Sequence, residues 1–160
     1  MAQPPESIAG NMEGCVMLAL STFRQSEKAI AIAIEKARDV RKLMVVYVAD
    51  VNLARYFVDV DLGLFGELRE TCEEDLLKQH EKSGKKHVAT ITAKAENEGI
   101  VVQSYSQIGR FALVCLEIVE RVKPSLIVTT RSKRPEWVKK FFGAPVDDLI
   151  ANAGCPVTVV

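Results

Sequence analysis

The sequence predicts an α/β fold in which a parallel sheet carries helices on both of its faces. Short apolar runs recur along the chain, and segments with apolar residues at helical spacing separate them. A continuous apolar run of about six residues is typical of a strand buried on both faces, and regular strand–helix alternation favours parallel pairing through crossover helices. The chain has 160 residues, of which 48% are hydrophobic and 26% charged, which fits a single globular domain.

The first part of the chain contains two strongly apolar runs with a helical segment between them. Strands are expected at residues 15–20 and 43–48. The intervening segment turns helical from Ser26, whose side chain is suited to an N-cap, and its apolar residues then recur at spacings of three and four. Residues 49–66 show no sustained period and are expected to form a long loop with a helical turn.

A long helix is expected from Glu67 to Asn97, with Gly84 as a point where it could bend or break and Gly99 as its stop. The side chains expected to face inward are Leu68, Cys72, Leu76, Val88 and Ile91. After it the pattern predicts strands at 100–106, 125–130 and 155–160, and helices at 109–122 and 145–152.

Charge, hydropathy and cysteine spacing exclude several classes of function. Lys plus Arg and Asp plus Glu both number 21, so there is no protein-wide basic field for nucleic acid or for an anionic membrane. No apolar run reaches the roughly 20 residues of a membrane helix, and the N-terminus has no signal-peptide pattern. The four cysteines are scattered without a Cys-x-x-Cys pair, which favours reduced, mostly buried thiols in the cytoplasm. Residues 1–13 are expected to be a flexible tail before one domain over 14–160.

Three stretches of the sequence resemble the universal stress protein family. They are Val16-Met-Leu-Ala-Leu-Ser with Ser26-Glu-Lys-Ala29, then Leu43-Met-Val-Val-Tyr-Val-Ala-Asp50, and finally Pro124-Ser-Leu-Ile-Val-Thr-Thr130 with the ending Gly154-Cys-Pro-Val-Thr-Val-Val160. The resemblance implies a doubly wound, five-stranded parallel sheet of strand order 3-2-1-4-5, the fold of the adenine nucleotide alpha hydrolases. It also implies a role in stress response or regulation.

The same resemblance directs attention to the loop after the fourth strand. ATP-binding members of the family carry Gly-x-x-Gly-x9-Gly-Ser/Thr there, because glycines let backbone N–H groups approach phosphates. In this chain Thr130 and Lys133 stand at the first two glycine positions, Gly143 keeps the third, and Ala144 replaces the hydroxyl residue. Much of the usual grip on ATP is therefore missing.

Further candidates for the ligand site come from other strand ends. Ser21 stands where the family has an acidic residue after the first strand, and Val48 keeps the valine that lies against adenine. Thr22 offers a second hydroxyl, and Gly109 begins a loop that lies near the nucleotide in the family. The candidate ligand-binding residues are therefore Ser21, Thr22, Val48, Gly109, Thr130, Lys133, Arg134, Gly143 and Ala144.

Residues 131–142 form an unusually basic stretch with interleaved aromatic residues. It contains Arg131, Lys133, Arg134, Lys139 and Lys140, with Trp137, Phe141 and Phe142. One interpretation is an anion site in which side-chain charge replaces backbone donors. The other is a solvated loop whose aromatic residues pack onto the sheet. Binding of single-stranded nucleic acid is disfavoured by the zero net charge.

No catalytic constellation is visible in the sequence. There is no Gly-x-Ser-x-Gly turn, and no histidine is placed to serve Ser21. His80 and His87 are about 10 Å apart along one helix face, too far to share a metal without further ligands. The first hypothesis is thus a non-catalytic cytoplasmic regulator acting on a protein partner. The alternative is a sensor of a nucleotide (ATP or AMP) or phosphate ligand in a modified pocket, and a nucleotide hydrolase ranks third.

The C-terminal run predicts a dimer. In the strand order that the family resemblance implies, Val157, Thr158, Val159 and Val160 form an edge strand that is apolar and uncharged. An exposed edge of this kind is a template for pairing, and a two-fold partner is a common cover. Family members dimerise through this strand. We therefore expect a homodimer, and a chain truncated after Cys155 is expected to be monomeric.

Overall fold

The computed structural model describes residues 12–21, 24–56, 66–131 and 145–160. Its centre is a sheet of five parallel strands in the order β3-β2-β1-β4-β5, which confirms the expected α/β fold and strand order. The strands are β1 (Val16–Ser21), β2 (Lys42–Asp50), β3 (Val101–Gly109), β4 (Leu126–Thr129) and β5 (Val157–Val159). β3 and β5 are the two edges, and β1 lies in the middle.

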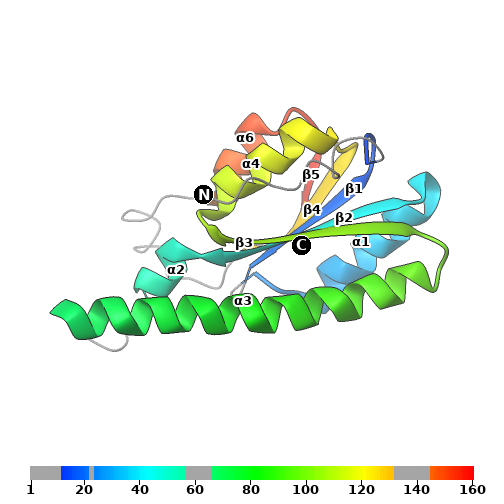
Figure 1. Ribbon diagram of the computed structural model, residues 1–160. Coiled ribbons are helices and arrows are strands. Elements are labelled where there is room, and N and C mark those ends of the chain that lie inside the picture. Colours follow the sequence, from blue (N-terminus) through cyan, green and yellow to red (C-terminus); the bar gives the residue numbers. More distant parts are fainter. Residues whose placement is uncertain (1–11, 22–23, 57–65, 132–144) are drawn as a thin grey trace.

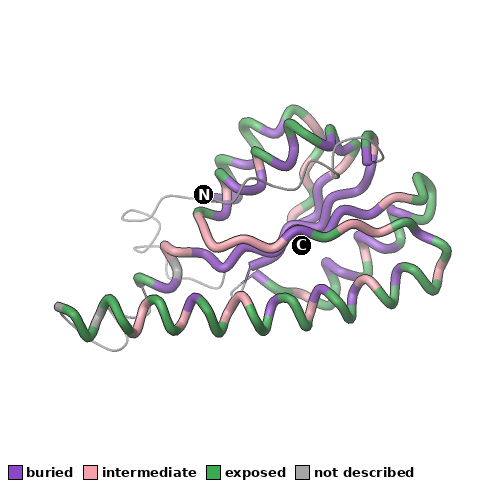
Figure 2. Tube along the Cα trace, viewed as in Figure 1, coloured by how far each residue is buried: buried purple, intermediate pink, exposed green. Residues whose placement is uncertain are grey.

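Helices cover both faces of the sheet (Figure 1). They are α1 (Glu27–Val40), α2 (Val51–Tyr56), α3 (Gly66–Glu96), α4 (Phe111–Val122) and α6 (Pro145–Asn152). Side chains of α1 and α3 pack with Leu18, Val45 and Tyr47 on one face, whereas those of α4 and α6 pack with Met17 and Val46 on the other. Successive residues of β1 and β2 thus enter opposite cores, which explains why these strands are apolar throughout (Figure 2).

The ends of α1 follow the signals expected from the sequence. Ser26 is the N-cap, and its side-chain oxygen accepts a hydrogen bond from the Ala29 backbone N–H at 3.2 Å. The helix ends at Arg41, which adopts the left-handed conformation with φ 61° and donates its backbone N–H to Ala37. In the expected loop after β2, residues 51–56 form the short helix α2.

Two expectations for the long helix are wrong. Leu68 was expected to face inward but is 64% exposed, and the buried leucine of this part of α3 is Leu77. Gly84 does not interrupt α3, which runs unbroken over 31 residues. A Cβ atom on Gly84 would clash with the ring of Tyr47, so the glycine allows α3 to approach the buried tyrosine of β2. The glycine is therefore explained by close packing against the sheet.

This contact predicts the effect of Gly84→Ala. Alanine normally stabilises a helix interior by about 1 kcal/mol relative to glycine. Here we expect the opposite sign, a net loss of about 1–2 kcal/mol in the free energy of unfolding, because the added methyl group overpacks the contact with Tyr47 by more than the gain in helix propensity. Urea denaturation followed by circular dichroism measures it. Ser83→Ala, at the exposed neighbouring position, is the control and should change stability by less than about 0.5 kcal/mol. Equal stability of the two variants would refute this account of Gly84.

Candidate functional site

The topology places the candidate site at the carboxyl ends of the central strands. β1 pairs with β2 on one side and with β4 on the other. The chain therefore builds β2 and β3 on one side of β1 and then crosses over to build β4 and β5 on the other side. In open parallel sheets, ligands bind beyond the strand ends at such a reversal. Ser21, Asp50 and Thr129 end β1, β2 and β4, and all three are buried.

A buried arginine occupies this position. Ser21 and Arg24 exchange two backbone hydrogen bonds of 3.3 and 3.0 Å, so the chain turns tightly after β1 and carries Arg24 back toward the strand ends. Nη1 of Arg24 donates to Oδ2 of Asp50 at 3.0 Å and to Oγ of Ser21 at 3.3 Å. The side chains of Arg24 and Asp50 are 1% and 2% exposed. The two charges therefore neutralise each other inside the protein.

Two helices are tied to this ion pair. The guanidinium carbon of Arg24 lies 4.5 Å from the ring centroid of Phe111, the first residue of α4, in cation–π geometry. The second carboxylate oxygen of Asp50 accepts the backbone N–H of Asn52 at 2.9 Å, at the start of α2. Burial lowers the pKa of Arg24 from its ordinary value, and the adjacent Asp50 opposes that shift. Nε of Arg24 is buried without a hydrogen-bond partner among the described residues.

The structure describes several of the residues that the sequence selected as ligand-binding candidates, and their side chains make contacts within the protein. Val48 is fully buried in the core cluster that also contains Phe111 and Val114. Thr130 donates its hydroxyl to the Val160 carbonyl at 2.7 Å. A Cβ on Gly109 would lie 2.9 Å from Cγ2 of Val114, so this glycine permits close packing of the end of β3 on α4. Ser21, a fourth candidate from the sequence, lies together with Arg24 and Asp50.

The remaining candidates lie outside the described residues. They are Thr22, Lys133, Arg134, Gly143 and Ala144, together with most of the basic stretch. Arg131, at its start, is described, and its Nη2 donates to Oδ1 of Asp147 on α6 at 2.7 Å. One of the five basic side chains is thus paired with a carboxylate.

Sequence reasoning missed Arg24, Asp50 and Phe111 as members of the site. Asp50 had a visible signal, because a carboxylate directly follows a long apolar strand at the edge of the sheet where ligands are expected. Arg24 had none, since a charged residue in a short polar segment ordinarily points to solvent. Phe111 stands at the start of an apolar helix and has the pattern of a core residue.

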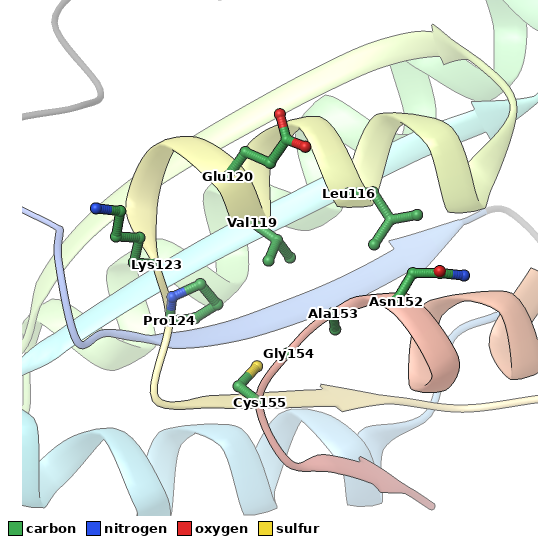
Figure 3. A pocket seen from close by; sticks show the side chains of 9 residues that line it. All are labelled: Leu116, Val119, Glu120, Lys123, Pro124, Asn152, Ala153, Gly154 and Cys155. Atoms are coloured by element: carbon green, nitrogen blue, oxygen red, sulfur yellow. The ribbon is translucent and has the colours of Figure 1, made fainter.

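A groove of about 660 Å³ lies at the other end of the strands, between α4 and the connection from α6 to β5 (Figure 3). Leu116 and Val119 point into it from α4, whereas the Glu120 carboxylate points away (Figure 3). Small residues, Ala153 and Gly154, line the opposite wall. A specific small-molecule site needs a few polar groups that converge on the ligand. Figure 3 shows that the Glu120 carboxylate does not point toward a ligand in the groove. We therefore do not assign this groove as the functional site.

Nucleophile and metal chemistry have little support in the described part of the chain. Its residues contain no group of three or more His, Cys, Asp or Glu side chains placed to hold a metal ion. All four cysteines are free. Burial raises the pKa of Cys15 to about 12 and raises that of Cys115 further, so both thiols are protonated at neutral pH.

Comparison with known proteins assigns the family. The model of the universal stress protein family matches residues 15–160, and the chain belongs to this family. No curated protein sequence matches. UspA from Lactobacillus plantarum is a similar solved structure, with a TM-score of 0.67, 14% identity, and coverage of 94% of this chain and 99% of that one. None of the described helices is long and apolar enough to cross a membrane.

Two other solved structures show the same fold. A universal stress protein from Archaeoglobus fulgidus has a TM-score of 0.60 and 13% identity, with coverage of 93% of this chain and 50% of that one. A universal stress protein family protein from Arabidopsis thaliana, solved with AMP bound, has a TM-score of 0.55 and 14% identity, and the coverage is 91% and 90%. At sequence identities of 13–14%, the similarity to these solved structures shows that the fold is shared.

The buried ion pair predicts a strongly non-additive double-mutant cycle. Arg24→Met leaves the Asp50 carboxylate buried without its partner and should cost about 3–5 kcal/mol of unfolding free energy. Asp50→Asn should also destabilise, and the double variant should lose about 1–3 kcal/mol less than the sum of the two. Urea denaturation of the four proteins measures the coupling. Arg38→Met removes a pair with Glu98 that lies on the surface, and its loss should be much smaller. Additive single effects would contradict a buried, coupled pair.

Proposed function

We propose that this universal stress protein is a non-catalytic cytoplasmic regulator that acts as a homodimer on a protein partner and does not hold ATP in the usual way of its family. The observation that carries the proposal is the Arg24–Asp50 pair at the strand-order reversal. It occupies the ends of β1 and β2 with two side chains that satisfy each other's charge.

The contacts of Arg24 disfavour an ordinary nucleotide grip in two ways. Phe111 places an aromatic ring at the strand ends. The guanidinium of Arg24 already lies over this ring, with its carbon 4.5 Å from the ring centroid. The positive charge of Arg24 is neutralised by its ion pair with Asp50, so Arg24 attracts a phosphate chain only weakly. The side chain of Thr130, which replaces the first glycine of the family's phosphate loop, is bonded to Val160. A phosphate approaching there would meet a side chain where the family has exposed backbone N–H groups.

The same residues give no support to hydrolysis. Activation of water or of a hydroxyl nucleophile needs a positioned base or a metal. Asp50, the carboxylate at the site, is held by Arg24 and by the backbone of Asn52. The Ser21 hydroxyl accepts a hydrogen bond from the arginine. Arginine remains protonated near neutral pH and therefore cannot take up a proton from the hydroxyl.

The homodimer part of the proposal rests on β5. Ile127 donates to the Pro156 carbonyl, and Val160 donates to the Thr129 carbonyl, so alternate residues of this segment face β4. By the two-residue period of a strand, the N–H and C=O groups of Val157 and Val159 face away from the sheet. The strand is uncharged and partly exposed, and therefore offers an open edge for a second copy.

A nucleotide sensor is the second candidate. The AMP bound to the Arabidopsis thaliana protein favours it, since that protein shares this fold. The buried Nε of Arg24 has no hydrogen-bond partner within the part of the chain that the structure describes, and it would be free to bind an anion if the side chain moved. In this alternative, Thr130 and the basic stretch would complete a modified pocket.

Thermal unfolding with a ligand panel separates the two candidates. The purified protein is melted with ATP, ADP, AMP, cyclic AMP, phosphate and sulfate, and the Arabidopsis thaliana relative with AMP is the positive control. A ligand at 100 times its dissociation constant stabilises by about 2.7 kcal/mol, or roughly 5–10 °C in a domain of this size. We expect no shift with any of them. A shift with nucleotides but not with sulfate would establish the sensor, and a shift with every anion would indicate binding by the basic stretch alone.

The β5 edge predicts the effect of Val159→Pro. Proline removes an outward N–H and leaves the hydrogen bonds to β4 in place, since those come from Pro156 and Val160. The molar mass measured by light scattering after size exclusion should fall relative to that of the parent, because the contacts between copies at β5 are lost. Val159→Thr retains the N–H and a β-branched side chain, and should assemble as the parent does. An unchanged mass for the proline variant would show that β5 is not the dimer contact.

A further inference from the structure

The opposite edge of the sheet, β3, has unusual features for an exposed strand. It is nine residues long, contains no charged residue or proline, and is at least partly exposed along its length except at Tyr105 (Figure 2). Native proteins usually protect such edges with charges, prolines or a covering segment. None of the described strands pairs with its outer side.

The direction of its backbone groups follows from one hydrogen bond. Val101 donates its N–H to the Arg41 carbonyl just before β2, so Val101 and every second residue after it face β2. The N–H and C=O groups of Val102, Ser104, Ser106 and Ile108 therefore point away from the sheet. These four consecutive outward residues can form the ladder of a further strand.

The sequence of β3 is nearly the same read in either direction from Tyr105. Ser104 and Ser106 flank it, Gln103 and Gln107 come next, and Val102 and Ile108 follow. An antiparallel pair centred on Tyr105 would place Ser104 opposite Ser106 of a second copy, and Val102 opposite Ile108. The outward-facing residues then meet one another as hydrogen-bonded pairs, which is the pattern that an antiparallel ladder requires. A two-fold axis needs a surface that complements itself in this way.

The helix beside the edge leaves room for the second copy. A groove of about 520 Å³ runs between α3 and β3. Its lining combines the small side chains Ala89, Ala93, Ser104 and Ser106 with the larger Lys85, Val88, Thr92 and Glu96. The charge of Lys85 in this groove is paired with Glu81 at 3.1 Å. Since α3 lies against β2 and β3, and strands are about 4.8 Å apart, the two α3 helices would come within about 10 Å. That is the ordinary spacing of packed helices.

We propose that β3 is a second self-association surface, at which two copies of this chain pair antiparallel about a two-fold axis at Tyr105. The inference does not depend on the proposed function, because β3 and β5 are opposite edges of the sheet. A chain that pairs through both edges forms assemblies larger than a dimer.

Disulfide trapping between two different variants tests the proposal and its register. Ser104→Cys and Ser106→Cys are made separately in a background in which the half-buried Cys72 and Cys155 are serine. Facing residues of a hydrogen-bonded antiparallel pair have Cα atoms about 5.5 Å apart, which suits a disulfide. The variants are mixed, oxidised with oxidised glutathione, and examined on a denaturing non-reducing gel. Thermal unfolding checks that each variant is folded.

We expect a covalent dimer in the mixture and little in either variant alone, because in this register each Ser104 faces Ser106 of the other copy. The denaturing gel separates chains held only through β5, so the result is independent of that contact. A mixture without covalent dimer, or equal yields from the separate variants, would overturn the proposal.

Discussion

The ion pair between Arg24 and Asp50 is the contact on which the functional end of this protein depends. It joins the turn after β1, the end of β2 and the starts of α2 and α4 through one guanidinium group and one carboxylate. A buried charge is costly unless another charge satisfies it. The position where parallel sheets bind ligands is therefore used here to hold the protein together.

The proposed loss of the family's usual hold on ATP rests on these contacts and on Thr130. The backbone of a glycine-rich loop offers N–H donors to a phosphate chain at no steric cost. Here the Thr130 hydroxyl donates a hydrogen bond to the Val160 carbonyl, which links the residue after β4 to the end of the chain. The protein keeps the universal stress protein fold over residues 15–160, while its strand ends are filled by side chains. A role that works through surfaces fits this chain better than one that works through a pocket.

The two sheet edges are the surfaces that the fold leaves open. Parallel strands buried under two helical layers satisfy their backbone groups everywhere except at the outer sides of β3 and β5. Both edges are uncharged, and β3 is the longer. Hydrogen-bonding groups on an open edge bind another strand whenever the side chains permit it. The proposed assembly through β3 and β5 would thus follow from the same parallel topology that places the site.

The local pattern of the sequence was enough to predict the elements that depend on it: the buried strands, the Ser26 cap and the helix from Pro145, with the strand order following from the family likeness. It could not show that Gly84 faces Tyr47, because residues so far apart meet only when α3 packs on β2. For the same reason it could not pair Arg24 with Asp50. Hydrophobic period and capping act within a few residues and can be read along the chain. The partner of a buried charge is chosen by the tertiary packing of distant segments, and that choice decided the chemistry of the site.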